Sequence, residues 1–357
     1  MPRQILRFFL FLFLASVSNS VATSYQLIDL GLLDYENSDF SCINNKGLIC
    51  GSFNNGHSKN ALVCNVKGSI NYTNINFSTM PIINDKGVIF GSCQIEMGYS
   101  FWSHPQEVIF KWSQPLSYFT NLRIKNLGFP AALKNERVVV ISANDDGYVL
   151  LMNEPLVEEY DNISFDYQIW LYVNGIFNKI EHPKLLVARK INNQAQILGA
   201  FFERTNDYYK IIPSIYDVAT KKICTLDFPS LAYGIDINDK GQVVGIFKDP
   251  LKNCYYGFFR DYSNKEYITI ENFQPIAVNN PGVIIGKFME GSKKNKPAIW
   301  SRGALQDLND LIPGLIDNKG HIWQSLDKLI DINDAGYIIG RGKYNGKRHG
   351  FLLSPMR

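Results

Sequence analysis

The sequence lacks a strong excess of charge of either sign, since its 357 residues hold 36 lysines and arginines against 33 aspartates and glutamates. A basic field that would attract nucleic acid or anionic lipid is therefore absent. The chain also lacks any long apolar run beyond its first residues. We therefore expect no nucleic-acid partner, and no membrane contact once those first residues are removed.

Motifs of familiar catalytic sites are missing as well. The chain has no His-Glu-x-x-His motif, no Gly-x-Ser-x-Gly elbow and no phosphate loop. Its five histidines are scattered, with no pair at the spacing of metal ligands: His57, His104, His182, His321 and His349. The sequence thus predicts no catalytic residue and no cofactor, and it favours a protein that is not an enzyme.

Two segments look like calcium loops but lack the ligands. "DINDKG" begins at Asp236 and "DINDAG" at Asp331, yet the fifth position is Lys240 in the first and Ala335 in the second. A calcium loop needs an oxygen ligand there and a Glu further on. We therefore interpret both segments as hairpin turns and expect no metal.

The first residues have the pattern of a secretory signal peptide. Arg3 and Arg7 precede an apolar run from Phe8 to Val17, and the small residues Ser20 and Ala22 follow. We expect residues 1–22 to be removed, leaving residues 23–357 as one domain without a linker, exported to the periplasm or beyond the cell. A buried strand or a membrane anchor is the alternative for this segment.

One eleven-residue phrase, such as "INDKGQVVGIF" from Ile237 to Phe247, occurs seven times. The copies start 40 to 60 residues apart, a spacing typical of propellers and solenoids. Asn tolerates left-handed backbone and Gly supplies a positive φ without steric cost, so each copy predicts a type I turn closed by a Gly bulge. The turn residues are Asn44, Gly47, Asn84, Gly87, Asn144, Gly147, Asn192, Asn238, Gly241, Asn279, Gly282, Asn333 and Gly336.

A second Gly lies inside the apolar strand that follows each turn, for example Gly245 in "QVVGIF". Gly within a strand marks a bulge or a close approach of another backbone. Leu151 replaces it in the third copy, so we expect different packing there.

Each repeat contains four short strands, which is the content of one propeller blade. The strand "YQLIDLG" precedes the first copy, whereas the last repeat ends on its third strand, "HGFLL". The N-terminal strand can therefore complete the last blade and hide both open edges. The sequence predicts an all-β protein, a propeller of seven four-stranded blades closed in this way.

These repeats resemble the HAF repeat family of extracellular bacterial proteins. The match is most specific in "LQDLNDLIPG" and in "INDAGYIIGRGKYNGKRHGFLLSP", where His349, Gly350 and Phe351 stand at the family's His-Ala-Phe positions. The resemblance implies export and a propeller-like fold, but no reaction. The other repeats replace the His by Asn60, Val108, Gln168, Pro213, Tyr256 and Pro297, so it is not a shared catalytic or metal group.

Loops that do not repeat carry most of the unusual residues. Aromatic and charged side chains on loops of a rigid scaffold are frequent binding residues. We predict ligand binding on the face opposite the Asn-Gly turns, while an edge-covering role for the aromatic residues stays open. The candidates are Tyr99, Phe101, Trp102, His104, Glu158, Glu159, Tyr160, Tyr208 and Tyr209.

Six cysteines permit fifteen pairings, and export would allow disulfides without requiring them. Cys50 and Cys64 fall on neighbouring predicted strands of the first blade. They are the predicted disulfide, with buried free thiols as the alternative.

We thus expect an exported, monomeric binding module whose ligand is a protein or a glycan. The alternative is a hydrolase or lyase acting on an extracellular polymer, with acidic residues near the propeller axis. Converging carboxylates at one mouth of the channel would favour the enzyme, and an apolar plug would exclude it. A structural protein of the cell surface is a third alternative, although "GFLLSPMR" has no sorting tail.

Overall fold

The protein's structure is a computed structural model. It describes residues 24–356 except 34–37, 55–58, 67–69, 77–79, 96–105, 114–123, 129, 131–136, 155–166, 183–184, 186, 205–208, 229 and 262–265. The predicted signal peptide lies outside these residues. Within them no helix is both long and apolar enough to span a membrane.

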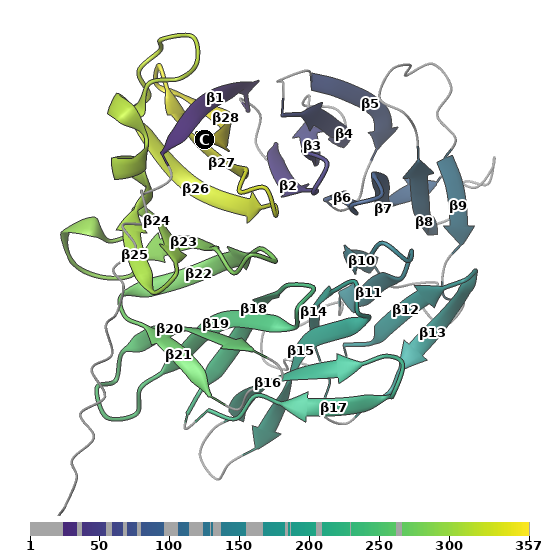
Figure 1. Ribbon diagram of the computed structural model, residues 1–357. Helices are drawn as coiled ribbons and strands as arrows, with labels where there is room; N and C mark the ends of the chain where they lie inside the picture. The colour runs from purple at the N-terminus through teal and green to yellow at the C-terminus, as the bar shows by residue number, and fades with distance from the viewer. Residues whose placement is uncertain are drawn as a thin grey trace, which may run out of the picture.

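Seven antiparallel four-stranded sheets are arranged around a central axis, which confirms the predicted propeller (Figure 1). Blade one holds β2 (Asp39–Ile43), β3 (Leu48–Asn54), β4 (Lys59–Asn65) and β5 (Ile70–Asn76). Blade two holds β6 (Ile82–Ile83), β7 (Val88–Ile95), β8 (Gln106–Ser113) and β9 (Ile124–Gly128). Blade three holds β10 (Arg137–Ala143), β11 (Val149–Glu154), β12 (Ile169–Val173) and β13 (Ile176–Ile180).

The other blades follow the same order from the axis outward. Blade four holds β14 (Val187–Ile191), β15 (Gln196–Arg204), β16 (Tyr209–Asp217) and β17 (Lys222–Thr225). Blade five holds β18 (Ala232–Ile237), β19 (Gln242–Lys248), β20 (Tyr255–Asp261) and β21 (Tyr267–Ile270). Blade six holds β22 (Phe273–Val278), β23 (Ile284–Phe288), β24 (Pro297–Ser301) and β25 (Ala304–Asp307). Three short 3-10 helices accompany the last blades: η2 (Gly291–Lys293), η3 (Leu308–Leu311) and η4 (Pro313–Leu315).

The two ends of the chain complete blade seven together. It contains β26 (Ser325–Ile332), β27 (Ile338–Tyr344), β28 (Lys347–Pro355) and, as its outer strand, β1 (Tyr25–Leu32). β1 pairs with β28 from Tyr25 opposite Pro355 to Leu32 opposite His349. The predicted closure by the N-terminal strand is therefore confirmed, and it covers the edge that β28 would otherwise expose.

The repeated phrase forms the hairpin between the first and second strand of each blade. In blade one the amide of Gly47 donates to the carbonyl of Asn44, and Gly47 has a φ of +74°. Glycine takes the same left-handed position in five other copies, which confirms the predicted turn type. Ala195 takes it in the fourth copy, at a φ of +56°.

The second Gly allows a close approach of backbone. A Cβ on Gly245 would lie 2.0 Å from the carbonyl oxygen of Tyr233, and one on Gly51 would lie 2.3 Å from that of Asp39. Both sites face a β-bulge in the innermost strand, where the register shifts by one residue. Leu151 at this position is fully buried and packs in a cluster with Trp170. The predicted close approach is thus confirmed, and the bulge lies in the strand opposite the Gly.

The hydrophobic core lies between neighbouring blades rather than in one central mass. Leu198 of blade four and Phe258 of blade five, both fully buried, belong to one such cluster. Phe228, which lies between these blades, has its ring centroid 4.5 Å from that of Phe258. Because apolar side chains fill the space between sheets, the axis is left to the residues of the innermost strands and their turns.

Candidate functional site

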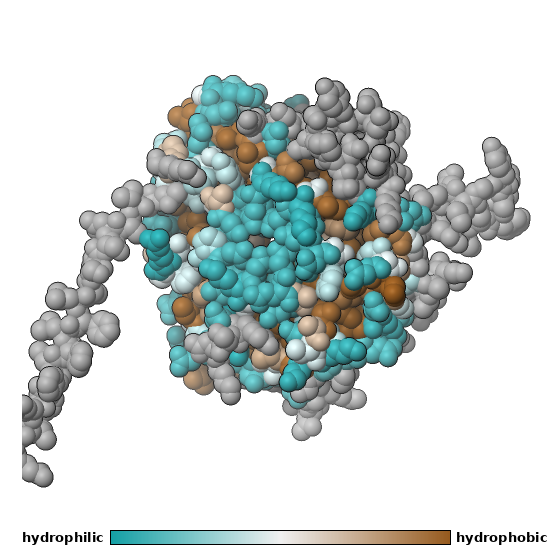
Figure 2. All heavy atoms as spheres, turned by 45° about the vertical axis from the view of Figure 1, so that its right-hand side comes forward, coloured by the Kyte–Doolittle hydropathy of each residue, from teal (hydrophilic) through white to brown (hydrophobic). Residues whose placement is uncertain are grey.

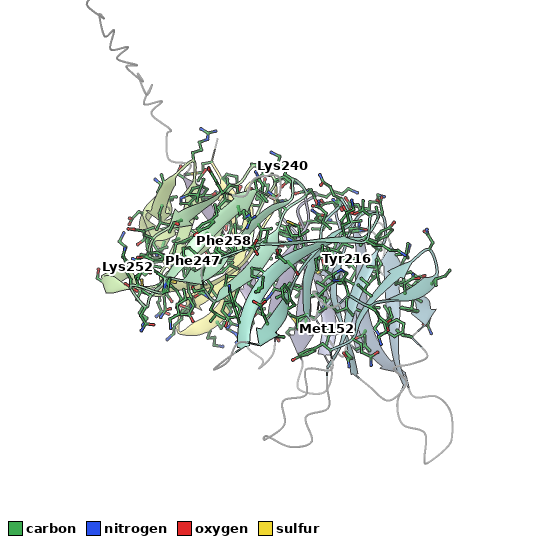
Figure 3. All side chains as sticks on the ribbon, turned by 90° about the horizontal axis from the view of Figure 1, so that it is seen from below. Met152, Tyr216, Lys240, Phe247, Lys252 and Phe258 are labelled. Carbon is green, nitrogen blue, oxygen red and sulfur yellow. The ribbon has the colours of Figure 1, made fainter. Side chains whose placement is uncertain are left out.

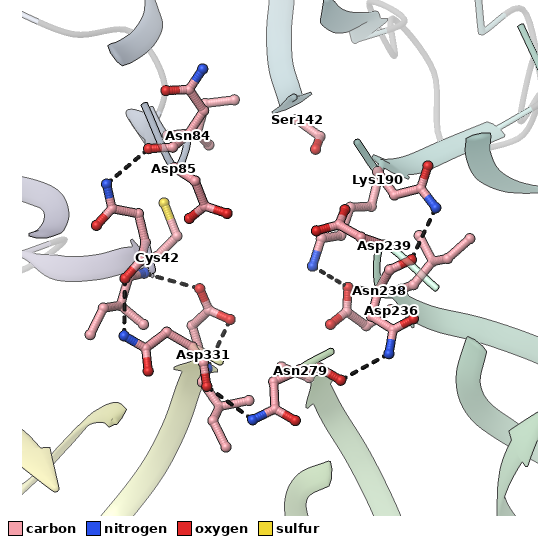
Figure 4. Close-up of a pocket in the computed structure, with 18 of the residues that line it drawn as sticks. Cys42, Asn84, Asp85, Ser142, Lys190, Asp236, Asn238, Asp239, Asn279 and Asp331 are labelled. Carbon is pink, nitrogen blue, oxygen red and sulfur yellow. Dashed lines mark hydrogen bonds and ion pairs between the residues drawn. The ribbon is translucent and has the colours of Figure 1, made fainter. Parts of the chain in front are cut away.

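A cavity of about 310 Å³ opens on the propeller axis at the end where the repeated turns lie. Its walls are the innermost strands and first turns of all seven blades (Figure 4). Lys240, in one of these turns, lies at one face of the propeller and Met152 toward the other (Figure 3). Hydrophilic residues gather around the centre of the turn face (Figure 2). The turn phrase therefore forms the polar mouth of the axial channel.

The first Asn of each phrase links its blade to the next. Its Nδ2 donates to the backbone carbonyl of the corresponding Asn in the following blade, at distances from 2.8 to 3.2 Å. The seven bonds form a closed circle through Asn44, Asn84, Asn144, Asn192, Asn238, Asn279, Asn333 and back to Asn44. All seven side chains are buried. We call this circle the asparagine ring.

The oxygen of the same side-chain amide stabilises the turn. Asn238 Oδ1 accepts from the backbone amides of Lys240 and Gln242, and Asn44 Oδ1 does the same for Lys46 and Leu48. A carboxylate or a hydroxyl could not supply both an NH₂ donor and a double acceptor. This explains why Asn, rather than Asp or Ser, stands at this position in every copy.

The next residue of each phrase forms a second circle, nearer the solvent, that we call the acidic ring. Its members are Asn45, Asp85, Asp145, Asn193, Asp239, Asn280 and Asp334. At six of the seven steps the backbone amide of one member donates to Oδ1 of the next. Each of the three Asn also donates through Nδ2 to the Asp on either side.

Asp and Asn alternate around the acidic ring except between blades two and three. Seven positions cannot alternate completely, and Asp85 and Asp145 are therefore neighbours with no Asn between them. Lys86 donates its backbone amide to Asp145 Oδ1 at 3.2 Å where the other steps use the ring residue itself. Burial raises the pKa of Asp85, as do the charges of Asp145 and the other ring aspartates, although a hydrogen bond from the Asn45 amide lowers it.

Below the two rings three charged side chains project from the innermost strands. Lys190 Nζ lies 2.6 Å from Asp236 Oδ1 in the next blade. Burial lowers the pKa of Lys190, but the charges of Asp236 and Asp331 raise it more, so that its pKa lies above the ordinary value. Lys190 therefore stays charged, and it gives the channel a fixed positive group beneath the acidic ring.

Asp236 and Asp331 bind the backbone of the following blade in the same way. Asp236 Oδ2 accepts from the Val278 amide at 2.9 Å, and Asp331 Oδ2 accepts from the Ile43 amide at 3.0 Å. Only Asp236 has a lysine at contact distance. Burial raises the pKa of the Asp331 carboxyl from 3.8 to about 6, although Lys190 lowers it in part.

The structure corrects the predicted disulfide between Cys50 and Cys64. Cys50 lies opposite Val63 and Cys64 opposite Ile49, so the two side chains point to opposite faces of blade one, and both are free thiols. Cys50 instead lies opposite Cys42 on the innermost strand, with 3.3 Å between the two sulfurs. The reason is the register, since Cys50 and Cys64 are offset by one position and a shift of one residue moves a side chain to the other face of the sheet.

The predicted loop residues lie almost entirely outside the part of the chain that the structure describes. These are Tyr99, Phe101, Trp102, His104, Glu158, Glu159, Tyr160 and Tyr208. Tyr209 begins β16, with its backbone opposite Arg204. Binding through those loops stays a prediction.

Sequence reasoning missed the channel residues, because it treated the turn phrase as structural only. The signal was present in the residue after the turn Asn, which is Asn or Asp in all seven copies. Asp236 and Asp331 begin the two segments that do not complete a calcium loop, and that pattern gives no sign of their place on the channel. Among the described residues, no group of three His, Cys, Asp or Glu side chains could hold a metal ion.

Comparison with known proteins identifies the fold. No family model and no curated protein matches the chain. The β-propeller domain of the Trilobed protease from Pyrococcus furiosus has a TM-score of 0.56 at 15% identity, covering 89% of this chain and 93% of that one. An oligogalacturonate lyase in complex with manganese has a TM-score of 0.58 at 9% identity, covering 94% and 95%. The Pyrococcus horikoshii acylaminoacyl peptidase has a TM-score of 0.53 at 13% identity, covering 91% of this chain and 52% of that one. At such identities the likeness shows the fold alone, and that fold is the β-propeller.

Proposed function

We propose that the protein is a binding module that receives a ligand in the polar mouth of the axial channel. The ligand presents hydrogen-bond donors, either hydroxyl groups or an amine, as the end of a glycan chain does. Asp85 and Asp145 make the principal contacts. The observation that carries the proposal is that no Asn lies between these two residues, so that two Asp side chains are neighbours at this step of the acidic ring.

Hydrogen-bond capacity supports this position over the rest of the ring. Asp239 and Asp334 each accept three bonds within the ring, two of them from neighbouring Asn side chains. Asp85 and Asp145 each accept two, one on each oxygen. A carboxylate has about four acceptor positions. Asp85 and Asp145 therefore keep the most capacity for donors from a ligand.

Charge supports the same class of ligand. The cavity is lined by six carboxylates and two basic side chains, Arg189 and Lys190. An amine or a partly positive hydroxyl hydrogen is attracted to this surface, and a donor placed between Asp85 and Asp145 relieves their repulsion. The cavity is also within the size range of small-ligand sites.

A glycan array probed with residues 23–357 tests the proposal. Binding of the best glycan should then weaken about tenfold or more in Asp145→Asn, because a hydrogen bond to a charged group is worth about 1.5–3 kcal/mol. Asp310→Asn, which removes an exposed carboxylate in η3, is the matched control and should bind as the wild type does. Unchanged affinity in Asp145→Asn would contradict the proposal.

The candidate residues predicted from the sequence provide an independent comparison. Trp102→Ala and Tyr208→Ala should leave binding unchanged if the channel mouth holds the ligand. Loss of binding in these variants, with full binding in Asp145→Asn, would place the ligand on the loops instead.

A hydrolase or lyase acting on a polymer is the second candidate function. It is supported by Asp331, because a carboxyl whose pKa is near 6 can exchange a proton at neutral pH. Carboxylates do converge at this mouth, and Lys190 provides a cation beside them. Release of reducing or unsaturated ends from acidic and neutral polysaccharides, lost in Asp331→Asn, would establish it. Intact polysaccharide after long incubation with the wild type would exclude it for those substrates.

Export is part of the proposal and rests on the N-terminal sequence alone. N-terminal sequencing of the protein recovered from outside the cytoplasm should begin at Thr23. An intact N-terminus beginning at Met1 would contradict it.

A further inference from the structure

A second cavity lies between blades seven and one and has the opposite charge. Its volume is about 610 Å³, and it shares Ser41, Ile276 and Ile330 with the walls of the acidic mouth. It therefore continues the axial channel away from the two rings. Among the residues that the structure describes, its charged lining is Lys328, Arg341 and Arg348 with one carboxylate, that of Asp39.

Two of these basic side chains are forced together by the sheet. Lys328 of β26 lies directly opposite Arg341 of β27. Like charges opposite each other on adjacent strands destabilise the pair. Asp39 Oδ2 accepts from both, at 3.3 Å from Lys328 Nζ and 2.8 Å from Arg341 Nη1. One carboxylate thus balances only one of the two cations.

Arg348 is held in place by a different set of contacts. Its Nε and Nη2 donate to the carbonyl oxygen of Leu33 at 3.1 and 3.0 Å, and Nη2 also reaches that of Ser38 at 3.4 Å. These contacts fix the position of the guanidinium beside the cavity.

The cations are also accessible. The side chain of Lys328 is 51% exposed and that of Arg341 is 29% exposed, although both contact Asp39. A guanidinium presents a planar fork of donors that matches carboxylate and phosphate oxygens. The cavity thus offers preorganised donors together with unbalanced charge.

We propose that this cavity binds an oxyanion, the carboxylate or phosphate group of a small ligand, between Arg341 and Lys328. The bound anion supplies the negative charge that Asp39 does not. The acidic ring at the other mouth repels the same anion, so the two mouths of the channel select ligands of opposite charge. The proposal does not depend on the ligand of the acidic ring.

Thermal unfolding of residues 23–357 in the presence of a probe tests this site. Inorganic phosphate and glucuronate are the probes, with chloride at equal ionic strength as the reference. A ligand that binds only the native state raises Tm as its concentration increases. We expect phosphate, glucuronate or both to raise the Tm of the wild type above the chloride reference. The more effective probe then identifies the class of oxyanion.

Two variants show whether the effect belongs to this cavity. Arg341→Gln leaves Lys328 and Asp39 as a balanced pair, and Lys328→Gln leaves Arg341 and Asp39. Each should remove most of the Tm increase, whereas Lys222→Gln, an exposed lysine on β17, should retain it. Failure of both probes to stabilise the wild type would overturn the proposal. An undiminished response in either cavity variant would also overturn it, by showing an adventitious effect of anions.

Discussion

His349 Nδ1 lies 3.0 Å from Asp29 Oδ1, and this contact joins the last strand of the chain to the first. The two side chains are only 12% and 11% exposed. Asp29 Oδ1 also accepts from the amide of Gly31, at the point where the register of β1 shifts. His349 is the residue that the HAF resemblance singles out, and its contacts here are those of a closure between the chain ends.

Removing this contact should weaken the pairing of β1 with β28 in blade seven. A buried hydrogen bond involving a charged group contributes about 1.5–3 kcal/mol, so Asp29→Asn and His349→Phe should each lower the free energy of unfolding by that order. A double-mutant cycle in urea should give a coupling energy of similar size. The exposed pair Lys179 and Glu181 is the control and should show little coupling. Additive effects of Asp29→Asn and His349→Phe would contradict this role.

The asparagine ring should be sensitive at every position. Asn279→Asp replaces the NH₂ that donates to the Asn333 carbonyl by an oxygen that repels it. Leaving a buried acceptor without its donor costs about 1–3 kcal/mol. Chemical denaturation should show a loss of this size, whereas Asn178→Ala, an exposed Asn on β13, should change little. Equal stability of the two variants would show that the ring contributes nothing.

Ala195 should be a site of stabilisation. It stands at a φ of +56° where all six other turns have Gly at φ values between +74° and +84°. Left-handed backbone costs a residue with a Cβ about 1–2 kcal/mol. Ala195→Gly should therefore raise the unfolding free energy by roughly 1 kcal/mol, and Gly241→Ala should lower it by a similar amount. A lower free energy of unfolding in Ala195→Gly would contradict the backbone strain inferred at this position.

The buried carboxyl of Asp331 should make the free energy of unfolding decrease as the pH rises through the acidic range. Its pKa in the folded protein is about 6 against 3.8 ordinarily, so between these values the native state binds the proton that the unfolded state has lost. Stability should then fall as pH rises from about 4 to 6, by about 3 kcal/mol relative to Asp331→Asn. Urea denaturation of both proteins across this range measures the difference. Parallel pH profiles would exclude the shift.

Cys42 and Cys50 should form a disulfide when oxidised. Their sulfurs lie 3.3 Å apart, and Cys42 also lines the channel, so a thiol oxidant can reach it. Oxidised glutathione takes up two electrons and two protons, the Cys42–Cys50 bond forms, and two glutathione thiols are released. Peptide mapping should find this pair and free Cys64. Burial raises the pKa of both Cys50 and Cys64, so slow oxidation is expected. A Cys50–Cys64 pair would contradict the register.

The architecture was predictable because each blade carries its own local signal. Asn238 and Gly241 favour a tight turn, and repetition of that turn predicts the blades. The strand before the first copy, which became β1, predicts their closure. The site was not predictable in the same way. That Asn279 donates to Asn333, or that Asp85 is next to Asp145, depends on how blades stand beside one another. Cys50 shows the same limit, since its partner follows from the strand register and a bulge at Ser41.

The neighbouring pair Asp85 and Asp145 in the acidic ring has a consequence for the whole molecule. Seven similar units would give a surface on which every direction around the axis looks much the same to a ligand. An even-numbered ring could place Asp and Asn in strict alternation and satisfy every donor. An odd-numbered ring leaves at least one pair of like neighbours, and here that pair is Asp85 and Asp145. The odd number of blades thus gives a nearly symmetric protein one distinguishable direction, and an eighth blade carrying Asn between blades two and three would erase it.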